Sequence, residues 1–118
     1  MNKKFPCVIK LAIWLALLVG ASPPALGEEF YKGKIVRFIL GNTPGGGYDT
    51  YTRAVARHIG KYIPGNPAPI VQNMVGAGGV TAANYIYSRV KPDGLTVGVW
   101  NSALVLRQAL GDRAIKFK

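Results

Sequence analysis

The fold is decided by the stretch Ile35-Val36-Arg37-Phe38-Ile39-Leu40-Gly41-Asn42-Thr43-Pro44-Gly45-Gly46-Gly47. Its first six residues are β-branched, aromatic or aliphatic with one charge, which predicts a mostly buried strand at 35–40. The glycine-rich residues 41–47 then end that strand. In the helix that follows, larger residues recur in steps of three and four and define one face, which we expect to be buried. These residues are Tyr48, Tyr51, Val55, Ile59 and Tyr62.

The same pattern then repeats along the chain. Residues 69–74 predict a second strand, 75–79 form a second glycine-rich break, and 80–90 predict a second helix. The buried stripe of that helix is expected to contain Val80, Ala83, Tyr87 and Val90. A Pro-Asp-Gly turn leads to a third strand at 95–100 and a third helix at 103–110, whereas residues from 111 onward are basic and unpatterned.

The predicted element order is β-α-β-α-β, which is typical of an α/β fold. Strands that alternate with helices imply a parallel sheet covered on both faces. Right-handed crossovers place successive glycine breaks at the same edge of such a sheet. Ligands of open α/β sheets bind at that edge, beyond the carboxyl ends of the strands.

Composition excludes several classes of protein. The chain has 118 residues with a formal net charge of +10, but an apolar fraction of 49% argues against disorder. A single cysteine excludes an internal disulfide and a cysteine metal cluster. A single histidine leaves too few ligands for a histidine-rich zinc site. We therefore expect neither a metal nor another cofactor.

The N-terminal residues have the order of a secretory signal. A basic start is followed by an unbroken apolar run at 11–19, then by small residues at 25–27. The alternative, a membrane anchor, is disfavoured because a span needs about 20 apolar residues. We expect residues 1–27 to be cleaved, leaving 28–118 as one small domain in the periplasm. The basic charge of an exported domain fits an anionic ligand or simply a soluble surface, and it does not point to nucleic acid.

The two glycine-rich breaks are predicted to bind an anion through their backbone N–H groups. Each joins a strand end to a helix start, where amide N–H groups lack partners and the helix dipole is positive. Glycine lets a ligand oxygen approach this backbone closely. Asp49, in the first helical turn, is expected either to cap its own helix or to contact a ligand. Tyr48, next to the glycines, can offer its backbone or its ring.

Known phosphate motifs do not fit these breaks. Gly47-Tyr48 stands where a Walker motif needs lysine and serine or threonine, and Thr50 and Thr81 stand where the dinucleotide fingerprint needs its third glycine or alanine. A carboxylate is the remaining common anion. His58 is expected on the solvated side of the helix, and no catalytic cluster is visible, so we expect no enzyme activity. A nucleotide- or dinucleotide-binding half-domain of an exported enzyme remains the alternative.

Three motifs in order resemble a known family of proteins. They are Pro44-Gly45-Gly46-Gly47-Tyr48-Asp49, then Asn73-Met74-Val75-Gly76-Ala77-Gly78-Gly79, and then Pro92-Asp93-Gly94. Together they resemble the substrate-binding receptors of tripartite tricarboxylate transporters (the TctC or Bug family). The resemblance implies a periplasmic receptor with two α/β lobes around a cleft, which binds a small carboxylate and delivers it to a membrane permease.

The resemblance also implies which residues contact the ligand. They are Thr43, Gly45, Gly46, Gly47, Tyr48 and Asp49 of the first loop, Gly76, Ala77, Gly78 and Gly79 of the second, and Asn101 and Ser102 after the third strand. Asn42 replaces a frequent phenylalanine, and Met74-Val75 replace a frequent Arg-Pro, which disfavours a tricarboxylate. The resemblance further implies that residues 28–118 are a partial first lobe, with the second lobe absent. A truncated product without function of its own is the remaining alternative.

Overall fold

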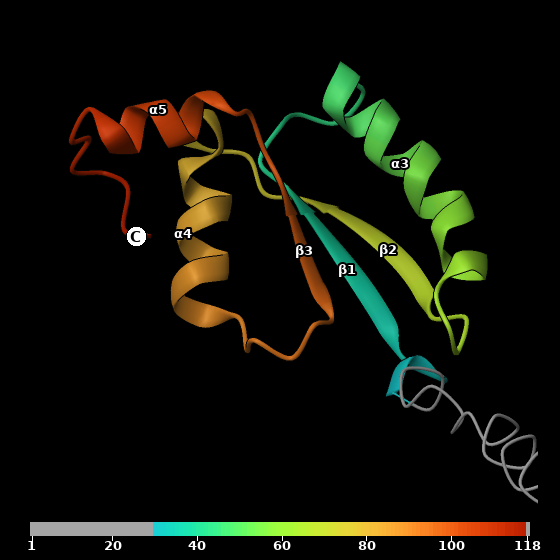
Figure 1. Cartoon of the computed structure of the whole chain (residues 1–118). Helices are drawn as coiled ribbons and strands as arrows, with labels where there is room; N and C mark the ends of the chain where they lie inside the picture. Colours follow the sequence, from blue (N-terminus) through green and yellow to red (C-terminus); the bar gives the residue numbers. More distant parts are fainter. Residues whose placement is uncertain (1–29, 118) are drawn as a thin grey trace, which may run out of the picture.

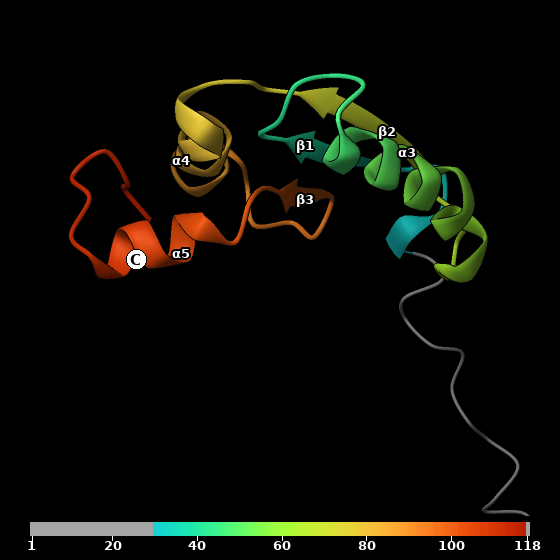
Figure 2. The same cartoon turned by 90° about the horizontal axis from the view of Figure 1, so that it is seen from above.

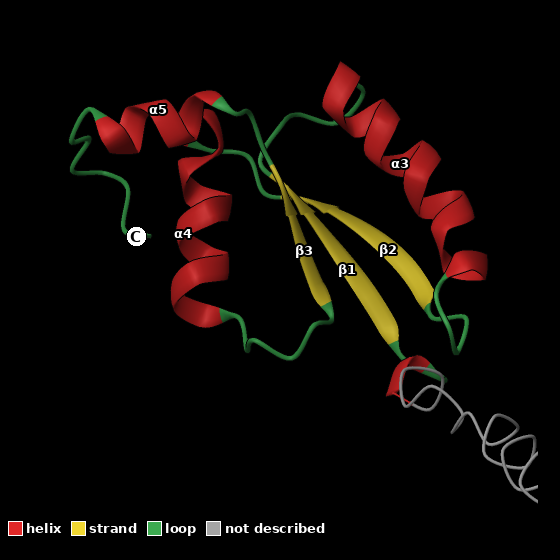
Figure 3. Ribbon diagram, in the orientation of Figure 1, coloured by secondary structure: helices red, strands yellow, loops and turns green. Residues whose placement is uncertain are grey.

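The computed structural model describes residues 30–117, and the expected signal segment at 1–27 lies outside them. The described chain is an α/β structure with three parallel strands and helices between them (Figures 1 and 3). The strands are β1 (Ile35–Leu40), β2 (Ala68–Asn73) and β3 (Thr96–Val99), in the order β2-β1-β3. Within the described range, no helix combines the length and apolarity needed to cross a membrane.

The central strand β1 carries the core, as its sequence predicts. Val36, Phe38 and Leu40 are buried on one face of the sheet, and Ile39 is buried on the other. Both neighbours run parallel to β1, so all three strands end level: Leu40 is paired with Asn73 of β2 and with Val99 of β3. This register brings the loops that follow the strands to one edge of the sheet.

The helix α3 (Gly47–Ile59) covers one face of the sheet and continues into a short 3-10 turn, η1 (Gly60–Tyr62). Ala56 of α3 packs against Val36 and Phe38, with Ile59 and Val71 around them. The helix therefore lies over β1 and β2, and Figures 1 and 2 both place it on the β2 side of the sheet.

The predicted buried face of α3 is wrong. Tyr51 is 77% exposed and Tyr62 is 74% exposed, while Tyr48 and Val55 are also exposed and Ile59 alone of that stripe is partly buried. The buried residues of α3 are instead Asp49, Thr52 and Ala56. Short side chains let the helix approach the sheet closely, and the tyrosine hydroxyls stay in water, where they need no partner.

The opposite side of the molecule is built by η2 (Ala77–Gly79), α4 (Val80–Arg89) and α5 (Ala103–Ala109). Val80 and Ala83 of α4 pack against Leu104 of α5, with Trp100 at the edge of this cluster. The residues beyond 110, expected to be unpatterned, also contribute Ile115 and Phe117 to it.

The stripe predicted for the second helix is half right. Val80 and Ala83 are buried, as expected, but Tyr87 is 55% exposed and Val90 lies after the last residue of α4. Ala82 is buried instead. The helix turns its small residues toward the sheet, as α3 does, because close packing favours them over tyrosine.

Gly98 lies under the Trp100 ring, on the face of the sheet that α4 covers. It is paired with Ile39 of β1, so it belongs to the face opposite Phe38 and α3. A Cβ at Gly98 would collide with the ring of Trp100 and would lie 2.9 Å from Ile86 of α4. The absence of a side chain at this position therefore makes room for the indole between β3 and α4.

We predict that Gly98→Ala lowers the free energy of unfolding by about 1–3 kcal/mol, because the added methyl group displaces the packed Trp100 ring. Urea denaturation measures this change. Gly47→Ala is the control, because nothing lies within 4 Å of a Cβ at Gly47 and its φ is not positive. That variant should be neutral or more stable by up to about 1 kcal/mol. An unchanged stability of Gly98→Ala would contradict the packing of Trp100.

Candidate functional site

The two glycine loops meet at the carboxyl edge of the sheet. The N–H of Gly41, directly after β1, donates to the carbonyl of Val99 at the end of β3 (2.9 Å). A Cβ at Gly41 would lie 2.8 Å from the Cα of Gly79, so the backbones of the first and second loops nearly touch there. Both α3 and α4 begin at this edge (Figure 1). The predicted juxtaposition of the two loops is confirmed.

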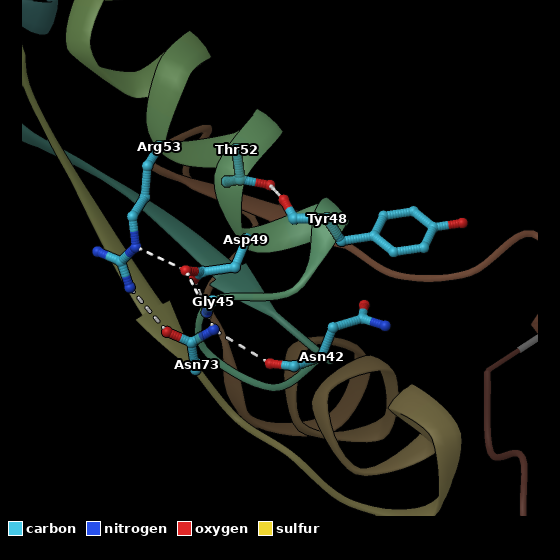
Figure 4. Close-up of polar contacts among 7 residues, drawn as sticks. All are labelled: Asn42, Gly45, Tyr48, Asp49, Thr52, Arg53 and Asn73. Atoms are coloured by element: carbon cyan, nitrogen blue, oxygen red, sulfur yellow. Dashed lines mark hydrogen bonds and ion pairs between the residues drawn. The ribbon is translucent and has the colours of Figure 1, made fainter.

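The first loop is held by the carboxylate of Asp49. This side chain is buried, and its Oδ2 accepts hydrogen bonds from the N–H of Gly45 (2.9 Å) and the Nε of Arg53 (3.0 Å). Its Oδ1 accepts from the Nδ2 of Asn73 (2.9 Å). The carboxylate thus joins the loop, the helix and the end of β2 (Figure 4).

Asn73 and Arg53 complete this network. The Oδ1 of Asn73 accepts from the Nη2 of Arg53 (2.9 Å), and its Nδ2 also donates to the main-chain carbonyl of Asn42 (3.1 Å). Sequence reasoning missed both residues as parts of the site. The spacing of Asp49 and Arg53, four residues apart on a helix, was a usable signal. The contact with Asn73 spans 24 positions and follows from the strand register.

These bonds hold the pKa of Asp49 well below its usual range, with the hydrogen bond from Arg53 as the largest cause and those from Gly45 and Asn73 next. Asp49 is therefore ionised under ordinary conditions. From the first turn of α3 it reaches back to the N–H of Gly45, one residue before the N-cap Gly46, and each of its two oxygens accepts from a protein donor. The carboxylate therefore positions the first loop from within, and its expected contact with a ligand stays a prediction.

The start of α3 presents unpaired donors. Gly46 precedes the helix without a side-chain cap. The N–H groups of Gly47 and Tyr48 have no acceptor among the described residues. They lie at the positive end of a 13-residue helix. The ring of Tyr48 and the amide of Asn42 project away from the Asp49 network (Figure 4).

The second loop has a backbone shaped by positive φ angles. Gly76, Gly78 and Gly79 have φ of +157°, +66° and +95°, and Ala77 has φ of +48°, which a residue with a Cβ rarely adopts. Such local strain is concentrated at functional sites. The N–H groups of Gly76, Ala77 and Gly78 have no acceptor in the described part of the chain.

An arginine from α5 holds this second loop. The Nη1 of Arg107 donates to the carbonyl of Ala77 (3.1 Å) and would lie 3.5 Å from a Cβ at Gly78. Its Nε donates to Asp112 (2.9 Å). Arg107 was not predicted, because its helix begins 24 residues after Gly79 and no local pattern marks it. It places a guanidinium beside the second loop.

The remaining predicted residues lie near this edge. Thr43 is exposed in the first loop, and its carbonyl accepts from the N–H of Gly46 (3.4 Å). Asn101 and Ser102 are exposed after β3 and Trp100, and the Oδ1 of Asn101 accepts from the N–H of Ala103 (2.8 Å). The Oδ1 of Asn42 is buried and has no donor among the described residues. His58 is exposed on α3, as expected.

No group of three or more histidine, cysteine, aspartate or glutamate side chains gathers within residues 30–117. No protein-family model, no curated protein and no solved structure matches the chain. The function is therefore inferred below from the motifs and the geometry of this edge.

We predict that Asp49→Asn destabilises the chain most near neutral pH and progressively less toward pH 2. The folded pKa of Asp49 lies below the unfolded value of about 3.9, so the carboxylate contributes stability above about pH 5 and loses it as pH falls. Thermal unfolding of both proteins between pH 2 and pH 7 measures this difference. A difference that stays constant across that range would contradict an ionised Asp49 network. Asp112, whose pKa is also lowered, is present in both proteins and does not affect the comparison.

Proposed function

We propose that this chain is a solute-binding receptor that captures a small carboxylate in the periplasm for a membrane permease of the tripartite tricarboxylate type. The observation that carries the proposal is the meeting of two glycine loops, each with unpaired N–H donors, at the carboxyl edge of one parallel sheet. Donors on rigid backbone bind an anion without a catalytic group.

The electrostatics of the two loops support an anionic ligand. The positive end of α3 lies behind Gly47 and Tyr48, and the guanidinium of Arg107 lies beside Gly78. Asp49 carries the negative charge closest to the first loop, but Arg53 neutralises it and the carboxylate is buried. A carboxylate oxygen near the loop amides therefore meets donors and partial positive charge.

The unpaired side-chain oxygen of Asn42 favours a ligand that carries a hydrogen-bond donor. A buried carbonyl oxygen without a donor costs about 1–3 kcal/mol, and the Oδ1 of Asn42 is such an oxygen at the base of the first loop. A carboxylate that also carries a hydroxyl or ammonium group would supply the missing donor. We therefore favour a substituted small carboxylate over a simple fatty acid.

The pair Gly47→Pro and Gly47→Ala tests the role of the loop amides. Gly47 is the first residue of α3, where proline is well tolerated, and Gly46 has φ −76° and ψ 170°, the extended conformation that precedes proline. Gly47→Pro removes one unpaired N–H, whereas Gly47→Ala keeps it. Loss of one hydrogen bond to a charged group costs about 1.5–3 kcal/mol. We predict that proline weakens carboxylate binding about 10- to 100-fold and that alanine leaves it within about twofold.

Isothermal titration of the 118-residue chain with a panel of hydroxy- and amino-carboxylates measures these affinities, with phosphate and a dinucleotide as comparison ligands. Circular dichroism of both variants confirms that they fold. Binding of the dinucleotide in preference to every carboxylate would overturn the proposal in favour of a nucleotide-binding half-domain. Equal carboxylate affinities of the proline and alanine variants would show that the N–H of Gly47 does not contact the ligand.

A further inference from the structure

A groove lies between α3 and β2, away from the unpaired amides of the two loops. Its volume is about 310 Å³, and it is lined by Arg53, Ala56, Arg57, Pro69 and Val71. Two guanidinium groups, one helical turn apart, lie along its α3 side. Ala56, Pro69 and Val71 give it an apolar surface. The groove thus combines an apolar contact area with two cations.

The two cations of the groove differ in their partners: Arg53 is paired with Asp49, whereas Arg57 has no carboxylate partner within residues 30–117. Arg53 uses Nε for Asp49 and Nη2 for Asn73, and its third nitrogen points away from both (Figure 4). Arg57 is exposed and forms no ion pair or side-chain hydrogen bond within residues 30–117. The groove therefore has donors available for an incoming carboxylate.

The carboxylates of the described chain are already engaged elsewhere. Asp49 pairs with Arg53, Asp112 pairs with Arg107, and Asp93 accepts the N–H of Leu95 (3.0 Å). A second copy of the chain brings the same basic excess, since the formal net charge is +10. Charge complementarity thus favours a different, acidic molecule over self-association.

The edge of β2 decides how such a molecule can bind. Ala68 and Met74 donate their N–H groups to β1, at Lys34 and Leu40, so the alternate residues of β2 face outward. Pro69 is one of these outward residues and has no N–H, which blocks regular addition of a strand. Recognition at this edge therefore depends on side chains in the groove.

We propose that this groove docks an acidic segment of a partner protein, with an apolar side chain on Ala56, Pro69 and Val71 and carboxylates on Arg53 and Arg57. The volume is at the low end for a small-molecule site and suits one apolar side chain with its neighbours. The loop amides do not line this groove, although Arg53 also belongs to the Asp49 network, and the proposal does not depend on carboxylate transport.

Fluorescence anisotropy of the 118-residue chain with a labelled peptide, Gly-Glu-Glu-Leu-Glu-Glu-Gly, tests the proposal. We expect saturable binding that Arg57→Gln weakens at least fivefold, because Arg57 has no other partner in the described structure. Lys61→Gln is the matched control. Lys61 follows Arg57 by four residues and does not line the groove, so this substitution removes the same charge from outside the groove. It should weaken binding less than twofold, and replacing the peptide's leucine with glycine should weaken it at least threefold.

Four outcomes would overturn the proposal. Absence of saturable binding excludes an acidic segment of this type as the occupant. If Arg57→Gln and Lys61→Gln weaken peptide binding equally, the binding reflects general charge attraction and not recognition in the groove. Tighter peptide binding after Glu28→Gln and Glu29→Gln together would assign the groove to the chain's own acidic segment. A dimer in sedimentation that Arg57→Gln dissociates would assign it to a second copy.

Discussion

The buried carboxylate of Asp49 is the interaction on which the candidate site depends. It accepts the N–H of Gly45 from the loop after β1 and the amide of Asn73 from the end of β2, while Arg53 balances its charge. Removing a buried charge from water is costly unless hydrogen bonds replace the lost hydration, and here three protein donors do so. Because Asp49 occupies the Gly45 N–H, it fixes the loop in one conformation and leaves the N–H groups of Gly47 and Tyr48 facing outward.

The second loop is held in a similar way from another element. Arg107 of α5 binds the carbonyl of Ala77 and pairs with Asp112, so that each glycine loop is stabilised by an arginine with an aspartate partner. In the first loop the aspartate accepts the backbone N–H, whereas in the second the arginine donates to the backbone carbonyl. In both cases side chains outside the loop restrict a glycine-rich segment, which would otherwise lose much conformational entropy on ordering. A pre-organised set of donors then binds an anion at lower entropic cost.

The sequence predicted the architecture well, because contiguous and local patterns determine it. The strand at 35–40 was predicted to the residue, and the other two strands and the helices α4 and α5 to within one residue at each end, whereas the stripe predicted for the first helix runs past the end of α3 into η1. The helix faces were predicted poorly. Apolar periodicity identified Tyr51 and Tyr62 as buried, but the sheet selects small residues at the contact, and Ala56 lies there instead. Burial of Asp49 depends on Asn73 and Arg53, whose meeting requires the strand register, and no local pattern contains that information.

Amide hydrogen exchange, resolved by residue with NMR spectroscopy, tests the central claim most directly. If Asp49 holds the first loop, the N–H of Gly45 is protected in the free chain, while those of Gly47 and Tyr48 exchange rapidly and become protected when a bound carboxylate is present. The protection of Gly45 should also persist at pH 4, where an ordinary aspartate is half protonated. Exchange of Gly45 as fast as that of Gly47 would contradict the account, because the loop would then have no fixed conformation from which to present its donors.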